Sequence, residues 1–219
     1  MQAEFWRERW ERNEIGFHIH KTNPNLLKHW HRTQLQAGDT VFVPLCGKTL
    51  DLLWFVEQGF NVVGVELVES AVQAFFAENN LAYLCQTQGA FTVYISDNIT
   101  IYCGDFFQLS KEMLTQCSGF YDRAALVSWS DALRQQYAQH LCSILPAQCQ
   151  GLLLVVDYLQ EQMTGPPFAI DQTMIDAFFA VHCDYRLLDV RDILKYEKKF
   201  QERGLHRLEE HIYWLKKVR

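Results

Sequence analysis

Residues 39–66 read DTVFVPLCGKTLDLLWFVEQGFNVVGVE, and this stretch decides the fold. The apolar runs at 39–45 and 61–66 have the length and composition of buried strands. Between them, residues 49–58 have the character of a helix that closes at Gly59. Two buried strands joined by a helix predict a parallel βαβ unit, because parallel strands need a crossover connection.

The alternation of strands and helices continues along the rest of the chain. We expect further helices at 69–79, 131–145 and 171–180, a strand beginning at residue 120, and strands at 151–158, 184–190 and 208–216. The segments 91–95 and 99–103 are expected to form either a hairpin or a single strand preceded by a β-turn. This pattern predicts an α/β fold: a Rossmann-like, doubly wound, mostly parallel seven-stranded sheet with helices on both faces. The last two strands are expected to pair antiparallel, because no full helix separates them.

The N-terminal segment precedes this alternation and is helical in character. Residues 4–12 and 23–36 are predicted to form two amphipathic helices, the second with Pro24 in its first turn. Because no repeat, low-complexity tract or Ser/Gly linker divides the chain, we expect one domain over residues 1–219. Within it, residues 1–36 are expected to form a helical cap over the ligand site.

Composition and charge exclude several classes of partner. The net charge is −6 with neutral histidines, and Lys and Arg are scattered rather than gathered into the basic stripe that nucleic acid requires. No apolar stretch approaches the roughly 18 residues of a membrane span, and the first residues lack the apolar segment of a secretory signal. The seven cysteines include no CxxC pair, which disfavours a disulfide framework or a zinc site. We therefore expect a cytoplasmic protein, a monomer, with no nucleic-acid or membrane partner.

The turn after the first strand reads PLCGKT over residues 44–49 and allows two interpretations. Its ending matches that of a phosphate-binding loop, but such a loop needs a glycine where this chain has Phe42. The alternative is the first turn of a nucleoside-binding fold, in which Gly47 is the one glycine of the dinucleotide fingerprint that is present. The sequence thus favours a nucleoside ligand without phosphates, with an ordinary strand-to-helix turn as the structural alternative.

Two acidic residues end predicted strands. Glu66 lies about 20 residues past the first turn, the spacing at which an acid accepts the ribose hydroxyls in Rossmann folds. Asp105 could accept a hydrogen bond from an adenine amine, with Phe106 packing against the ring. Each acid also has a structural alternative: Glu66 as an acid at a helix N-terminus, and Asp105 as the cap of residues 106–112.

Asp122 and Arg123 stand where a strand meets its loop, flanked by apolar residues. An arginine in such surroundings usually has a carboxylate partner. Arg123 is expected either to hold a ligand carboxylate or an electron-rich substrate, or to form a structural ion pair with Asp122.

Aromatic and histidine residues near the N-terminus invite further interpretation. The rings of Trp6, Trp10 and Phe17 could cover a ligand as a lid or pack on the core. Two histidine pairs have i, i+2 spacing, at 18/20 and at 29/31. No Cys or acid completes a metal site with them, so we expect no metal.

Six motifs occur in order along the chain: Trp6-x-x-x-Trp10, Gly16-Phe17-His18, Pro44-Leu45-Cys46-Gly47-Lys48, Val63-Gly64-Val65-Glu66, Asp122-Arg123-Ala124-Ala125-Leu126 and Gly165-Pro166-Pro167-Phe168. Together they resemble the thiopurine S-methyltransferases, in their bacterial form, and the resemblance covers essentially the whole chain. It implies a class I methyltransferase that uses S-adenosyl-L-methionine as methyl-donor cosubstrate and converts thiopurines to S-methyl thiopurines.

The resemblance also implies roles for particular residues. Cofactor contacts fall on Trp10, Leu45, Glu66 and Arg123. Two more residues match a cofactor-contacting position that varies in the family: Asp105 and Phe106. A loosely aligned basic position on the substrate side is Lys199. The run at 127–131 departs from the usual Val-Ala-Leu-Pro pattern, which changes the rim of the substrate site rather than the cofactor site.

The implied reaction is an in-line displacement in which a thiol or thiolate sulfur of a small aromatic or heterocyclic molecule attacks the sulfonium methyl group. Sulfur is nucleophilic and the leaving thioether is neutral, so positioning and desolvation supply most of the rate and no protein residue is expected as an obligatory catalytic group. Arg123 would act by charge, favouring the thiolate.

Alternatives are a methyltransferase for inorganic selenium, tellurium or thiocyanate-like anions, and a non-catalytic nucleoside-binding module. The incomplete glycine fingerprint disfavours a dinucleotide-dependent oxidoreductase.

Overall fold

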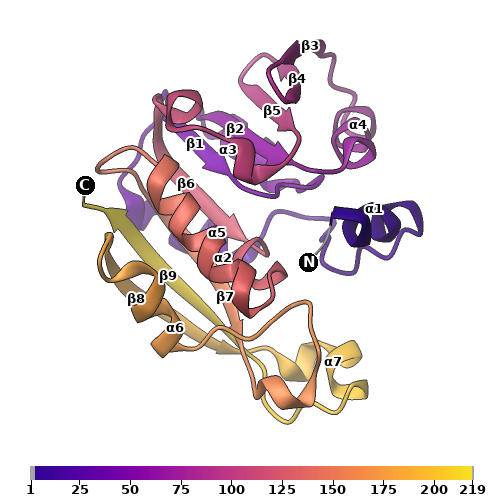
Figure 1. Ribbon diagram of the computed structural model, residues 1–219, viewed down its shortest axis with the longest axis vertical. Coiled ribbons are helices and arrows are strands. Elements are labelled where there is room, and N and C mark those ends of the chain that lie inside the picture. Colours follow the sequence, from indigo (N-terminus) through magenta and orange to yellow (C-terminus); the bar gives the residue numbers. More distant parts are fainter. Residues whose placement is uncertain (1–2, 219) are drawn as a thin grey trace.

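The computed structural model describes residues 3–218 and contains one mixed sheet in the order β3-β4-β5-β2-β1-β6-β7-β9-β8 (Figure 1). The strands are β1 (Thr40–Val43), β2 (Asn61–Glu66), β3 (Leu84–Gln88), β4 (Phe91–Ser96), β5 (Ile99–Cys103), β6 (Cys117–Arg123), β7 (Gln150–Asp157), β8 (Cys183–Asp192) and β9 (Glu209–Lys217). The predicted α/β class is confirmed, although the described sheet has nine strands rather than seven.

The centre of the sheet is parallel and its two ends are antiparallel. Strand β1 pairs in parallel with β2 and β6, β2 with β5, and β6 with β7. Strand β9 lies between β7 and β8 and is antiparallel to both, as predicted for the last two strands. At the other end, β3, β4 and β5 form an antiparallel meander. The extra strands come from this meander, because β4 and β5 are separate strands and β3 adds an edge.

Helices cover both faces of the sheet and bury two apolar cores. Their bounds are α1 (Ala3–Glu11), α2 (Pro24–His29), α3 (Asp51–Glu57), α4 (Glu69–Glu78), α5 (Asp131–Ile144), α6 (Gln172–Phe179) and α7 (Lys198–Glu202). One core joins α5 and α6 to the sheet, and the other joins α2, α3 and α4 to its opposite face (Figure 1). The residues of β1 show the division: Val41 and Val43 belong to the second core and Phe42 to the first, because successive side chains of a strand point to opposite faces.

The predicted helix at 23–36 is shorter in the structure. Asn23 caps it by accepting a hydrogen bond from the N–H of Asn25 at 2.8 Å, and Pro24 occupies its first position. After His29 the chain continues as a 3₁₀ turn and then ends at Gln34, which has a left-handed φ of 57°. That backbone conformation cannot continue a right-handed helix, which explains the early end.

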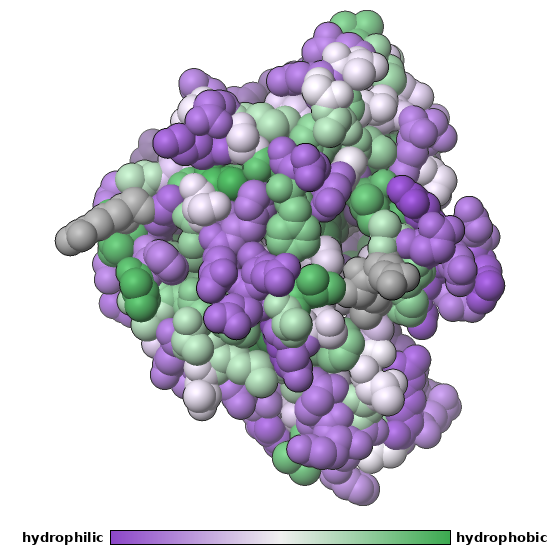
Figure 2. All heavy atoms as spheres, in the orientation of Figure 1, coloured by the Kyte–Doolittle hydropathy of each residue, from purple (hydrophilic) through white to green (hydrophobic). Residues whose placement is uncertain are grey.

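Within residues 3–218, no helix is both long and apolar enough to cross a bilayer. On the face shown in Figure 2, hydrophilic side chains are distributed among hydrophobic ones. All seven cysteines are free thiols, and all but Cys85 are buried, as expected for small apolar side chains.

Candidate functional site

A cavity of about 310 Å³ lies at the carboxyl ends of the parallel strands, the edge at which doubly wound sheets bind ligands. Its walls come from the ends of β2, β6 and β7, from the turns after β1 and β5, and from segments near α1 and α7, which flank this edge (Figure 1). All six residues that the sequence analysis assigned to cofactor binding line this one cavity: Trp10, Leu45, Glu66, Asp105, Phe106 and Arg123. Their roles toward a ligand are taken up under the proposed function.

The turn after β1 brings backbone close to the cavity. Leu45 and Gly47 have left-handed φ angles of 47° and 53°, and the N–H of Cys46 donates to the carbonyl of Val65 on β2 at 2.9 Å. A Cβ on Gly47 would lie 3.2 Å from Cζ2 of Trp10. Glycine therefore suits this position both by its backbone freedom and by the ring that covers it. A non-glycine residue with positive φ, such as Leu45, is a kind of strain that clusters at ligand sites.

Glu66 ends β2 with its carboxylate buried and held by backbone. Its Oε2 accepts from the N–H of Gly47 and its Oε1 from the N–H of Val68, both at 2.8 Å. Burial raises the pKa of the carboxyl, and these hydrogen bonds oppose the rise by favouring the charged form. A carboxylate oxygen can accept more than one hydrogen bond, so Glu66 keeps acceptor capacity toward the cavity. The helix-terminal and ligand-binding interpretations are thus compatible.

Asp105 and Phe106 follow β5 and have different surroundings. Asp105 is exposed and its Oδ1 accepts from the N–H of Phe107 at 3.0 Å, so it does cap the following turn. Phe106 is buried, with its ring centroid 4.7 Å from that of Tyr137 on α5. Both also line the cavity, so the capping role does not remove them from the site.

The expected alternative of an Asp122–Arg123 ion pair is wrong. Asp122 is fully buried on the α5 side, where it accepts hydrogen bonds from the hydroxyl of Tyr137 at 2.7 Å and from the N–H of Leu126 at 3.2 Å. Burial raises the pKa of its carboxyl to about 6. Because neighbouring residues of a strand point to opposite faces, Arg123 instead lines the cavity. Across residues 3–218 its guanidinium makes no ion pair, which leaves it free for a ligand.

An aromatic wall from the N-terminal segment closes one side of the cavity. The ring of Phe17 lies edge-on to Trp6 and to Trp10, with centroid distances of 5.7 Å in both cases. All three line the cavity, although α1 has no fully buried residue. By contrast, Leu26 and Trp30 of the predicted cap pack in the core with α3. Only the part of the predicted cap before Asn23 lies against the cavity, and residues 1 and 2 fall outside the described chain.

Another part of the cavity wall contains residues that the sequence analysis did not find. Trp129, Phe200, Arg203 and Glu210 line it together with Lys199, which the resemblance aligned loosely with a basic position on the substrate side. They were missed because they come from a loop, from the short helix α7 and its end, and from the start of the antiparallel strand β9, none of which is the carboxyl end of a parallel strand. Nζ of Lys199 donates to the carbonyl of Gly16 at 2.7 Å, which links this wall to the N-terminal segment.

The seven strands β5-β2-β1-β6-β7-β9-β8, with an acid at the tip of β2 and a cavity at the carboxyl edge, define the fold of S-adenosylmethionine-dependent methyltransferases. Two solved structures are similar over most of this chain. Burkholderia thailandensis 1,6-didemethyltoxoflavin-N1-methyltransferase, with bound 1,6-didemethyltoxoflavin and S-adenosylhomocysteine, has a TM-score of 0.67 at 13% identity and covers 99% of this chain and 87% of its own. A methyltransferase from Anabaena variabilis has a TM-score of 0.63 at 14% identity over 98% of this chain and 94% of its own.

Sequence similarity identifies the family within this class. The model of the family "Thiopurine S-methyltransferase (TPMT)" matches residues 1–218. Thiopurine S-methyltransferase of Azotobacter vinelandii is 48% identical over 99% of this chain and 100% of its own, and that of Pseudomonas fluorescens is 46% identical over 98% and 99%. The chain belongs to the thiopurine S-methyltransferase family, and it is an S-adenosylmethionine-dependent methyltransferase.

Proposed function

We propose that this protein transfers the methyl group of S-adenosylmethionine to the sulfur of a small aromatic or heterocyclic thiol, giving the S-methyl thioether and S-adenosylhomocysteine. The observation that carries the proposal is the convergence of six separately assigned residues on one cavity, with the Glu66 carboxylate buried at its floor. The names of the full-length relatives from Azotobacter vinelandii and Pseudomonas fluorescens support thiopurines as representative acceptors.

The cavity has the polar and aromatic groups that a phosphate-free adenosine ligand needs. We assign the ribose diol to Glu66, whose two oxygens can accept both hydroxyls, and the adenine to Asp105 and Phe106. Leu45 and Trp10 would lie along the methionyl part of the ligand. Arg123, whose guanidinium has no ion-pair partner in residues 3–218, would bind the carboxylate of that methionyl part. The indole N–H of Trp6 is buried with no hydrogen-bond partner within those residues, which is consistent with a ligand acceptor in this wall.

The remaining half of the cavity suits a flat, sulfur-bearing acceptor. Trp129 and Phe200 provide aromatic surface, and Lys199 and Arg203 provide positive charge. When bound, S-adenosylmethionine supplies an electrophilic methyl carbon and a neutral leaving thioether. The residues of this chain orient the acceptor, exclude water and stabilise negative charge on its sulfur, and orientation alone can supply about 7–11 kcal/mol.

The N-terminal segment is proposed to be the cover of this site. Trp6, Trp10 and Phe17 line the cavity from a helix that has no fully buried residue, so the segment is anchored more weakly than the rest of the fold. We propose that the protein acts as a monomer.

Two experiments test the proposed function. Calorimetric titration with S-adenosylmethionine, and separately with S-adenosylhomocysteine, should show one binding site per protein chain for each compound. A screen of aromatic and heterocyclic thiols should then yield S-methyl products by mass spectrometry. Binding of the donor without turnover of any thiol would instead indicate a nucleoside-binding module. Turnover restricted to selenite, tellurite or thiocyanate would replace the thiol acceptor by an inorganic anion.

A further inference from the structure

Glu210 is one of the acidic residues that line the cavity, and the pairing of β9 with β7 fixes its position in the sheet. It is the second residue of β9 and pairs with Val156 at the end of β7, so it reaches the same edge of the sheet as the parallel strands. Both Val156 and Glu210 line the cavity. The preceding Glu209 instead accepts from Arg207 at 2.6 Å and does not line the cavity.

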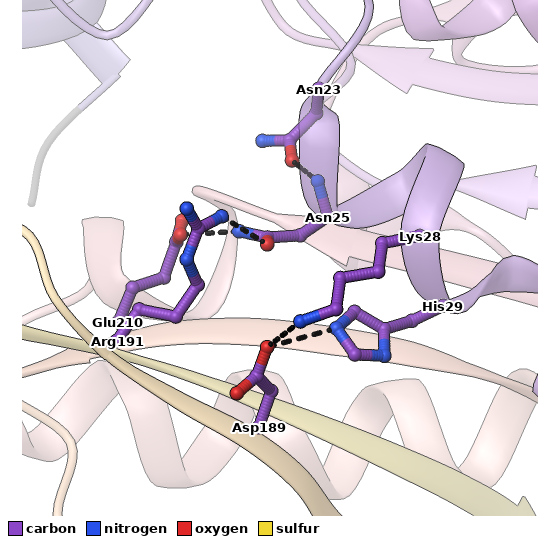
Figure 3. Close-up of polar contacts among 7 residues, drawn as sticks. All are labelled: Asn23, Asn25, Lys28, His29, Asp189, Arg191 and Glu210. Atoms are coloured by element: carbon purple, nitrogen blue, oxygen red, sulfur yellow. Dashed lines mark hydrogen bonds and ion pairs between the residues drawn. The ribbon is translucent and has the colours of Figure 1, made fainter.

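One oxygen of Glu210 is held by an amide whose orientation is itself fixed. A guanidinium nitrogen of Arg191 on β8 donates to Oδ1 of Asn25 at 2.9 Å, so the amide NH₂ of Asn25 must point the other way (Figure 3). There it donates to Oε2 of Glu210. Oε1 has no hydrogen-bond partner within residues 3–218, which leaves one carboxylate oxygen with free acceptor capacity in a residue that lines the cavity.

The charges around Glu210 suit a proton acceptor. Burial raises the pKa of its carboxyl, and Glu197 acts in the same direction. Arg123 on β6, Asn25 on α2 and Arg191 on β8 oppose the rise and favour the carboxylate. The result is an ionised acid with more basic character than an exposed glutamate, beside a cavity that also contains the cations Lys199 and Arg203.

We propose that Glu210 is a catalytic residue that accepts the ring N–H proton of acceptors that enter as neutral heteroaromatic thiones. This inference rests on the proposed function and deepens it. Such acceptors carry an N–H donor next to a C=S group, which matches the free carboxylate oxygen of Glu210 in a cavity that also contains cations. The N–H bond breaks as the proton passes to Oε1 of Glu210. The electrons of the N–H bond form a C=N bond in the ring, and the C=S π electrons move onto the sulfur. The sulfur bonds to the methyl carbon, and the bond from that carbon to the donor sulfur breaks, leaving a neutral thioether.

The test compares two acceptors that differ in protonation. At pH 6.5, 2-mercaptopyridine is the neutral thione, whereas 4-nitrothiophenol is already a thiolate and needs no base. Glu210→Gln keeps the size of the side chain and an oxygen for Asn25. We expect it to lower kcat/KM for 2-mercaptopyridine by about 100-fold. For 4-nitrothiophenol, kcat/KM should stay the same or rise, because a negative charge near the anionic sulfur has been removed.

The pH profile and two controls keep the result specific. With saturating donor, wild-type kcat/KM for 2-mercaptopyridine should fall at acid pH as Glu210 becomes protonated, and this fall should be absent in Glu210→Gln. Glu209→Gln, on the same strand but outside the cavity, should behave as wild type. Calorimetry with S-adenosylhomocysteine should give the same Kd for wild type and both variants, showing that the fold and donor site are intact.

The outcomes separate the two proposals. An equal loss with both acceptors, or no loss with either, would overturn the role of Glu210 while leaving thiol methylation in place. A wild-type enzyme that methylates neither acceptor, nor any thiol in the screen, would overturn both.

Discussion

The Oε2 atom of Glu66 accepts a hydrogen bond of 2.8 Å from the backbone N–H of Gly47, and this contact joins the tip of β2 to the turn after β1. The two residues come from neighbouring parallel strands, so one acid both fixes the turn and faces the cavity. The turn and the acid therefore form one unit of the proposed donor site.

Glu66→Gln should weaken the binding of S-adenosylhomocysteine by about 10- to 100-fold, because hydrogen bonds to a charged acceptor contribute about 1.5–3 kcal/mol. Isothermal titration calorimetry measures this loss. The exposed Glu57→Gln on α3 is the matched control and should bind as wild type. An unchanged Kd in Glu66→Gln would remove this carboxylate from the donor site.

Gly47→Ala should lower both the free energy of unfolding and the affinity for S-adenosylhomocysteine. Its φ of 53° is strained for alanine, at a cost of about 1 kcal/mol, and the new Cβ would press on Trp10. Gly89 in the β3–β4 turn has a φ of 58° with no atom within 4 Å of such a Cβ. Gly89→Ala should therefore lose similar stability in urea unfolding without losing affinity. Equal affinities in the two variants would contradict the proposed contact of this turn with the donor.

Arg123→Ala should reduce kcat/KM for thiol methylation by about 10- to 100-fold while leaving the fold intact. Within residues 3–218 its guanidinium forms no ion pair, so its removal breaks no direct salt bridge. Arg186→Ala, exposed on β8, is the control for the loss of one positive charge. Wild-type kinetics in Arg123→Ala would exclude it from the site.

Asp122 should make the stability of the protein depend on pH. Its folded-state pKa of about 6 exceeds the ordinary value of 3.8, so between these values the folded state binds more protons than the unfolded state. Its contribution to stability is therefore present at low pH and lost as the pH rises through 6, by about 3 kcal/mol. Urea unfolding of wild type and Asp122→Asn at pH 4 and pH 7 measures this.

The informative quantity is the difference in unfolding free energy between wild type and Asp122→Asn. It should shift in favour of the variant by about 2 kcal/mol on going from pH 4 to pH 7, because at pH 4 the unfolded-state carboxyl is already partly ionised. A constant difference would show that the Tyr137 hydrogen bond balances the burial of the charge.

The sequence predicted the parts of the fold and site that local pattern determines. The apolar runs at 39–45 and 61–66 identified β1 and β2, and the position of Glu66 at a strand end located the carboxyl edge. Strand β3 was not predicted because all five of its residues are exposed, so it has no apolar pattern. Glu210 was not predicted because its place in the cavity depends on the pairing of β9 with β7, which is a long-range contact.

Helix α1 should be stabilised by the donor, which is the test of the proposed cover. This nine-residue helix has no buried residue, and its Trp6 and Trp10 pack against Phe17 of the same N-terminal segment. Local stability follows buried contacts, so its amides should exchange rapidly in the free protein. S-adenosylhomocysteine would contact Trp6 and Trp10 only when α1 is in place, and therefore favours that state. Hydrogen exchange measured by mass spectrometry should show protection of residues 3–11 on binding.

The internal control is α4, whose Phe75 and Phe76 are fully buried, and which should be protected with or without ligand. If α1 were equally protected in both states, it would belong to the rigid framework, and the donor would have to enter by a route that leaves α1 in place.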